Sequence, residues 1–274
     1  MSLFMVNDEK CDRCGMCILE CPARIIGMVE PHKLPSWVDR GEERCINCGH
    51  CVTVCPLEAI SLETMKPEDC ALVRKELLPT QEQVEHFLRS RRSIRVYEEK
   101  PVPKHILAKL VDIARYAPSG RNSQPINWLV VQDSVEVKRL AGLVIDWMRL
   151  IIKEAPYVAN LWHFDFMVDA WECGLDTIMR DAPHVIVGYA SKDLPLAEGN
   201  CGIALTYLEL AAYSQGLGAC WAGWFQAAAT FYPPMAEALH LPEGHQSYGA
   251  MMIGYPKHTF HRIPLRNEPT ILWR

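Results

Sequence analysis

CDRCGMCILECP, residues 11–22, and CINCGHCVTVCP, residues 45–56, decide the fold of the first part of this chain. Both stretches place four cysteines at the spacing C-x2-C-x2-C-x3-C and follow the last one with proline. Each cysteine of the first run has a counterpart 34 residues later, beginning with Cys11 and Cys45. The constant offset indicates an internal duplication, bridged by a segment, 22–44, that is rich in proline, glycine and charge.

Three closely spaced thiolates in such a run hold three corners of a [4Fe-4S] cube, and the fourth cysteine binds the other cube. Two runs therefore predict two clusters with crossed ligands. The first cluster takes Cys11, Cys14, Cys17 and Cys55. The second cluster takes Cys45, Cys48, Cys51 and Cys21. Two zinc sites or a disulfide framework are the alternatives, but structural zinc usually shows two separated pairs of ligands.

The two runs resemble those of bacterial two-cluster ferredoxins, over about the first 60 residues. Four further cysteines are scattered along the chain: Cys70, Cys173, Cys201 and Cys220. Their scatter is typical of a reducing compartment rather than of a disulfide framework, so we expect a cytoplasmic protein. Such cysteines are more often small buried hydrophobic residues than reactive thiols.

Length and composition predict two soluble domains with sizeable cores. The chain has 274 residues, of which 49% are hydrophobic and 22% charged. Its formal net charge is -5 and its basic residues form no long tract, so neither nucleic acid nor an anionic membrane is an expected partner. The N-terminal stretch lacks the pattern of a signal peptide, and no stretch offers the ~20 apolar residues of a membrane helix.

The expected domain boundary follows the second cysteine run. We predict a cluster domain over residues 1–64, a linker over 65–79 and a second domain over 80–274. Thr80 and Gln83 form a capping box, which predicts that a helix begins there.

Helices alternate with a few strands along the second domain. Strands are expected at 128–132, 183–190 and 248–253, with a short strand or loop at 220–225. Helices are expected near 103–114 and at 134–154, 198–215 and 227–239. The order predicts an α+β fold with one central sheet packed between helices.

A basic run opens the second domain with Arg91, Arg92, Ser93 and Arg95. Iron–sulfur cubes pass single electrons, so the attached domain either relays them or collects two for a reaction, as a flavin does. Guanidinium groups bind phosphate through paired, charge-assisted hydrogen bonds, which suits a flavin phosphate. A solvated basic face at a helix end is the alternative interpretation of the run alone.

Four more stretches accompany the basic run in one order. They are PSGRNSQP at 118–125, Asp181-Ala182-Pro183, GLGACWAG at 216–223, and Gly254-Tyr255-Pro256 followed by Arg262. Together the five resemble the nitroreductase family of FMN-dependent oxidoreductases across residues 80–270. This resemblance implies a nitroreductase-like fold and a homodimer with FMN at its interface.

The resemblance also implies roles for matching residues. The FMN phosphate and the pyrimidine side of the ring would be held by Arg91, Arg92, Ser93 and Arg95. Arg262 would be a further phosphate contact. The flavin would be lined by Pro118, Ser119, Gly120, Asn122 and Gln124, some of them from the partner subunit. Trp221, Ala222 and Gly223 would run along the ring, where small residues let a backbone N–H approach closely.

No side chain is predicted to be a catalytic acid or base, because the cofactor carries the chemistry in this family. His50 and His261 are expected to be structural or surface residues. The aromatic residues of 155–171 either stack on a planar substrate or fill the core or the dimer interface.

The predicted function is reduction of an electron-poor acceptor, of the nitroaromatic or quinone type, by FMN that receives single electrons through the two clusters. A ferredoxin or another low-potential protein is the expected donor, and NAD(P)H is compatible with the sequence. Reductive dehalogenation, reduction of an activated double bond, and a non-catalytic electron-transfer adaptor are the alternatives. Two further alternatives are a cluster pair with a purely structural role and a redox sensor.

Overall fold

The computed structural model describes residues 3–28, 30 and 33–274, so positions 29 and 31–32 of the predicted bridge lie outside the described residues. The chain divides into two units. The first runs to Pro79 and takes in Gly120–Ser123, and the second holds Thr80–Ser119 and Gln124–Arg274. Within the described residues, no helix is long and apolar enough to cross a membrane.

The backbone of the first unit repeats with the period of the cysteine runs. Helices α1 (Met16–Leu19) and α2 (His50–Thr53) have the same length and each follows a left-handed glycine. These glycines, Gly15 and Gly49, have φ angles of 76° and 74°. The left-handed conformation lets the chain turn sharply between the second and third cysteines of each run.

Two short antiparallel sheets complete the first unit. Strand β1 (Phe4–Val6) pairs with β4 (Ile60–Leu62), and β2 (Ile26–Gly27) pairs with β3 (Ser36–Trp37). Its core combines Phe4, Ile25, Ile26, Val52, Ile60 and Leu62 with the buried cysteines Cys17, Cys21 and Cys51. A 3₁₀ turn, η1 (Glu42–Arg44), precedes the second cysteine run. Two further turns, η2 (Pro67–Asp69) and η3 (Lys75–Leu77), interrupt the predicted linker.

One antiparallel sheet forms the centre of the second unit, in the order β5-β6-β8-β7. Its strands are β5 (Asn127–Val131), β6 (His184–Ser191), β7 (Gly218–Trp221) and β8 (His245–Gly254). Alternate residues of β6 face opposite layers: Val185 and Val187 belong to one hydrophobic core, and Ile186 belongs to the other. Both faces of the sheet are therefore covered, as the sequence predicted.

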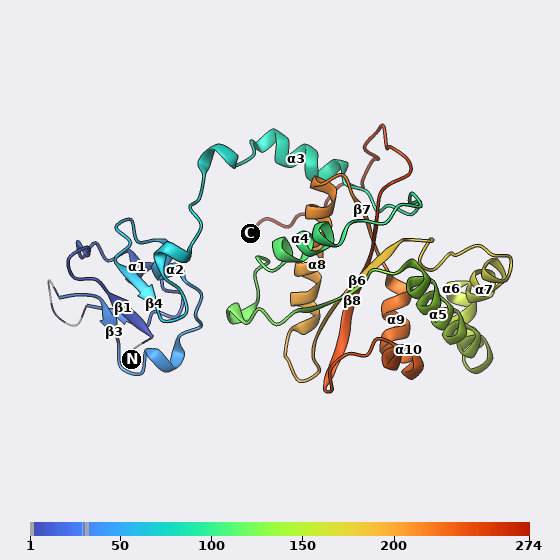
Figure 1. Ribbon diagram of the computed structural model, residues 1–274, viewed down its shortest axis with the longest axis horizontal. Helices are drawn as coiled ribbons and strands as arrows, with labels where there is room; N and C mark the ends of the chain where they lie inside the picture. The colour runs from blue at the N-terminus through green and yellow to red at the C-terminus, as the bar shows by residue number, and fades with distance from the viewer. Residues whose placement is uncertain (1–2, 29, 31–32) are drawn as a thin grey trace. The chain divides into compact units, whose positions relative to one another are not determined.

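Helices lie on both faces of this sheet (Figure 1). Helices α4 (Lys104–Ala114) and α8 (Ala197–Ser214) cover one face. The other face is covered by α5 (Ser134–Glu154), α6 (Pro156–Trp162), α7 (Phe164–Glu172), α9 (Gly223–Phe231) and α10 (Pro233–Ala238). Helix α3 (Gln81–Ser90) begins at Thr80, and the capping box with Gln83 is confirmed.

Close contact between α8 and the sheet depends on two paired glycines. Gly188 of β6 and Gly249 of β8 lie opposite each other. A Cβ at Gly188 would lie 2.6 Å from Cys201 Sγ, and one at Gly249 would lie 2.5 Å from Leu205 Cδ1. Both neighbours are fully buried residues of α8, so side chains at these strand positions would push the helix off the sheet.

The single helix predicted over 227–239 is wrong, because the structure has two helices there. Helix α9 ends at Phe231 and α10 begins at Pro233. Tyr232 between them is extended, with φ -124° and ψ 103°. A residue before proline is sterically excluded from the helical region, and Pro233 lacks the N–H that would continue α9.

Candidate redox site

The eight cysteines of the two runs form two groups of four. One cavity is lined by Cys11, Cys14, Cys17 and Cys55. A second cavity is lined by Cys21, Cys45, Cys48 and Cys51. The fourth cysteine of each run thus joins the first three of the other run, which is the crossed arrangement that the spacing predicts. We call these groups quartet I and quartet II.

The pKa values of two buried thiols identify the same groups. Burial raises the pKa of Cys17 to about 11, and nearby Cys11, Cys55 and Cys14 raise it as well. Burial also raises the pKa of Cys51 to about 12, and Cys48, Cys45 and Cys21 add to the effect. Thiolates in each quartet repel one another, so a cationic iron centre is the group that would stabilise four of them together.

The quartets fit an iron–sulfur cube better than a single ion. Among residues 3–28, 30 and 33–274, no three His, Cys, Asp or Glu side chains are placed to hold one metal ion. The cysteines instead line two separate cavities, four to each, and four thiolates are the ligand set of one [4Fe-4S] cube. Hydrogen bonds already reach some sulfurs, because Ala59 N–H donates to Cys55 Sγ at 3.3 Å and Asn47 N–H donates to Cys45 Sγ at 3.4 Å.

In the second unit, the predicted phosphate run packs directly against β7. Ile94 N–H donates to the Ala219 carbonyl at 2.9 Å, and Ser93 pairs with Ala219 in a parallel bridge. Gly218 makes this approach feasible, because a Cβ there would lie 2.6 Å from Ile94 Cγ1. The structure therefore places residues 91–95 beside the 216–223 stretch. Trp221 is exposed and Ala222 buried, and Gly223 begins α9, whose N-terminus carries a partial positive charge.

Two of the predicted arginines share one cavity. Arg92 and Arg262 both line a space of about 540 Å³, together with His261 and Phe260. The Arg92 guanidinium lies 5.7 Å from the centre of the Phe260 ring. Arg91, by contrast, turns to α8 and forms an ion pair with Glu209 at 2.7 Å. The guanidinium groups of Arg91 and Arg92 therefore contact different parts of the second unit.

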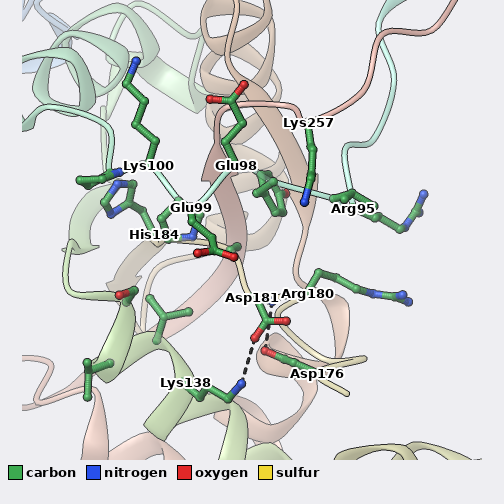
Figure 2. A pocket seen from close by; sticks show the side chains of 18 of the residues that line it. Arg95, Glu98, Glu99, Lys100, Lys138, Asp176, Arg180, Asp181, His184 and Lys257 are labelled. Atoms are coloured by element: carbon green, nitrogen blue, oxygen red, sulfur yellow. Dashed lines mark hydrogen bonds and ion pairs between the residues drawn. The ribbon is translucent and has the colours of Figure 1, made fainter. Parts of the chain in front are cut away.

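Arg95 lines a larger cavity, of about 1110 Å³, which also includes Arg180. Figure 2 shows the side chains of Arg95 and Arg180 extending in the same direction. Arg180 and Asp181 both adopt left-handed backbone angles, with φ 59° and 51°, and Lys138 holds the Asp181 carboxylate at 2.9 Å. Strained backbone of this kind is often found at functional sites. The sequence interpretation missed Arg180, although Asp181-Ala182-Pro183 lies directly after it.

The 118–125 loop is divided between the two units. Pro118, Ser119 and Gln124 line a small cavity of the second unit, separate from those of Arg92 and Arg95. Gly120 and Asn122 belong to the first unit, where the Asn122 amide donates to the Asn47 carbonyl at 2.9 Å. Within the second unit, the cavities lined by Arg92 and Arg95 do not include the described residues Pro118, Ser119 and Gln124.

The aromatic segment is partly buried in the core and partly exposed. Phe164 is buried and lies 5.1 Å from Trp224, ring centre to ring centre. Trp162 is half exposed, at 51%, and its ring stands edge-on to Trp224 at 5.5 Å. Because Trp224 follows Gly223 in α9, this aromatic cluster adjoins the 221–223 stretch.

Fold and site together define an oxidoreductase whose cluster-binding module comes first in the chain. Residues 10–60 match the 4Fe-4S dicluster domain, and residues 88–255 match the Nitroreductase family. The chain therefore belongs to the nitroreductase family.

Individual relatives agree with this assignment. A NADH dehydrogenase of Thermus thermophilus is 29% identical over 202 residues, which cover 67% of this chain and 92% of the relative. An iodotyrosine deiodinase of Thermotoga neapolitana is 23% identical over 192 residues, which cover 66% of this chain and 91% of the relative.

Solved structures show the same fold for the second unit. A nitroreductase with bound FMN from Bacteroides fragilis has a TM-score of 0.58 at 22% identity, covering 71% of this chain and 100% of that one. An iodotyrosine deiodinase bound to FMN and 3-iodo-L-tyrosine has a TM-score of 0.55 at 19% identity, covering 70% of this chain and 98% of that one.

Proposed function

We propose that this chain is an FMN-dependent reductase that receives single electrons through two [4Fe-4S] clusters and transfers two electrons to an electron-poor acceptor. The crossed cysteine quartets carry the proposal, because each provides the four thiolates that one cube requires. Domains over residues 1–64 and 80–274, joined by 65–79, would divide the cluster and flavin sites between them.

FMN is proposed because solved structures of this fold contain it. When bound, FMN supplies a redox centre that accepts electrons singly and releases them in pairs. Arg92 and Arg262 share one cavity and suit its phosphate, and Arg95 and Arg180 share another that suits the polar edge of its ring. Arg91 and Ser93 would complete this set.

A homodimer is proposed to complete the flavin site. Pro118, Ser119 and Gln124 line a cavity apart from those of the arginines, so the partner subunit would bring its own copies to the flavin. Gly120 and Asn122 lie in the same loop and are proposed with them. Trp221, Ala222 and Gly223 would lie along the ring, with the N-terminus of α9 directed at it.

A nitroaromatic or quinone is the proposed acceptor, and the exposed edge of the aromatic cluster around Trp162 supports a planar one. The two iodotyrosine deiodinases among the relatives favour reductive dehalogenation as a second candidate. A low-potential protein donor suits the clusters, and the NADH dehydrogenase relative favours a test of NAD(P)H as well.

Anaerobic reconstitution followed by analysis tests the proposal. We expect about eight iron atoms per chain, as two cubes require, together with bound FMN. The reduced protein should then turn over nitroaromatic and quinone acceptors, and release of iodide from 3-iodotyrosine would identify the second candidate. A protein that binds four or fewer iron atoms, or that reconstitutes without FMN, would contradict the proposal.

A further inference from the structure

The two halves of the first unit differ at one position beside the cysteines. Met16 begins α1 and His50 begins α2, each directly after its left-handed glycine. His50 Nδ1 lies 3.1 Å from Cys48 Sγ. The methionine side chain has no N–H, so Met16 cannot donate a side-chain hydrogen bond to a cysteine of the first half. The duplication therefore supplies a natural comparison between the two quartets.

When Cys48 binds iron, His50 must be the donor in the His50–Cys48 hydrogen bond. A cysteine that binds iron does so as a thiolate, which has no proton to donate. The hydrogen bond is then Nδ1–H to Sγ, for a neutral or a charged imidazole alike. One-electron reduction of a cube adds negative charge to its sulfurs, so a donor at a ligand sulfur stabilises the reduced cluster more than the oxidised one.

Backbone donors reach one sulfur in each quartet. In quartet II the Asn47 N–H donates to Cys45 Sγ at 3.4 Å, and in quartet I the Ala59 N–H donates to Cys55 Sγ at 3.3 Å. Among the described residues, the hydrogen bonding of the two quartets therefore differs in the side-chain donor His50. This extra donor favours the reduced state at quartet II.

We propose that His50 is a positioning residue that gives the cluster of quartet II the higher reduction potential, so that a single electron in the first unit rests there. The inference depends on the proposed function only in requiring that both clusters form. It assigns an order of potentials to them: the cluster of quartet II would be reduced before the cluster of quartet I.

Potentials of the reconstituted full-length protein test this order. An anaerobic redox titration, followed by electron paramagnetic resonance at one fixed pH, gives a midpoint for each cluster. Exchange of the two equivalent residues provides the variants, His50→Met and Met16→His. We expect H50M to lower the higher midpoint and leave the lower one in place. M16H should raise the lower midpoint, since Met16 is 42% exposed and leaves room for an imidazole.

A third variant separates hydrogen bonding from packing. His50→Gln keeps an N–H donor of similar reach, so it should retain more of the higher midpoint than H50M does. The inference is overturned if H50M and wild type share the same two midpoints while both hold two clusters. It is also overturned if M16H leaves the lower midpoint unchanged. This second test remains valid even if H50M fails to bind its clusters. A wild-type protein that lacks clusters would instead contradict the proposed function.

Discussion

Arg91 and Glu209 form an ion pair, 2.7 Å from Nη1 to Oε1, that joins the start of the 91–95 segment to helix α8. The Glu209 side chain is only 9% exposed, and burial raises the pKa of its carboxyl while Arg91 opposes that rise. Because Arg91 leads the segment that packs on β7, the pair fixes one end of the proposed flavin site. Breaking it therefore affects both folding and binding.

The variant Arg91→Ala should weaken FMN binding roughly 10- to 100-fold, because a charge-assisted phosphate contact contributes about 1.5–3 kcal/mol. It should also leave Glu209 buried without its cation. Glu209 would then take up a proton more readily in the folded than in the unfolded state, so the loss of stability in R91A relative to wild type should become smaller as the pH falls towards 5.

Fluorescence titration with FMN and denaturant unfolding at several pH values measure both effects. Arg89→Ala is the matched control, because Arg89 pairs with Glu85 on the exposed face of α3, where ion pairs contribute little. Equal FMN affinity in wild type and R91A would remove Arg91 from the proposed site.

A methyl group at Gly218 should separate the phosphate run from β7. In Gly218→Ala, the new Cβ would lie 2.6–2.8 Å from three atoms of Ile94, including its Cβ, so the backbone of the run must move. We expect a loss of about 1–3 kcal/mol in the free energy of unfolding, together with weaker FMN binding. Gly199→Ala in α8 is the control, because its Cβ would meet nothing within 4 Å. The outcome that counts against this packing is equal stability of the two variants.

His184 should make the second unit less stable in mild acid. It is fully buried, its Nε2 accepts the Val102 N–H at 2.7 Å and its Nδ1 donates to the Gln132 carbonyl at 2.7 Å. Burial lowers the pKa of this imidazole, so it stays neutral in the folded state while the unfolded chain takes up a proton near pH 6.5. The free energy of unfolding should therefore fall as the pH decreases below about 6.5.

Denaturant unfolding between pH 7 and pH 5 measures this slope. His184→Gln should be less stable at pH 7 and should show a flatter pH dependence than wild type. His105→Gln, on the exposed side of α4, should retain the wild-type slope. An unchanged slope in H184Q would show that another group titrates.

Trp162 should contribute to turnover of planar acceptors. Its ring is half exposed and contacts Trp224, which follows Gly223, so Trp162→Ala removes one wall beside the proposed flavin edge. We expect kcat/KM for nitroaromatic or quinone acceptors to fall roughly 2- to 10-fold, as stacking contacts contribute about 0.5–1.5 kcal/mol. Tyr157→Ala in the same helix is the control, because Tyr157 is 81% exposed and makes no ring contact with Trp224 among those of the described residues. Similar kinetics of the two variants would assign Trp162 a packing role.

The sequence predicted features that depend on local spacing. Cysteine spacing identified both quartets, and the capping box at Thr80 placed the start of α3 correctly. Gly216, one residue after the C-cap of α8, has a left-handed φ of 72°, a conformation that suits glycine. The prediction of one helix over 227–239 followed its alanine-rich composition and overlooked the local signal of Pro233 and Pro234, at which α10 begins.

Long-range contacts could not be predicted in the same way. Glu209 meets Arg91 from 118 residues away, and nothing in the local pattern of α8 marks it. His50 resembled any surface histidine until its distance to Cys48 was known. Cys201 and Cys220 are buried as expected, with burial raising the pKa of Cys201 to about 12, whereas Cys173 is exposed.

The delivery of electrons from the clusters to the flavin is the central claim. Anaerobic stopped-flow mixing with a one-electron, low-potential donor follows cluster and flavin absorbance separately in the FMN-loaded protein. The double variant Cys14→Ala, Cys48→Ala, also loaded with FMN, removes one ligand from each quartet. We expect wild-type flavin to be reduced only as the clusters become reduced, and the double variant to lose this reaction while still binding FMN. Flavin reduction at the same rate in both proteins would contradict the account.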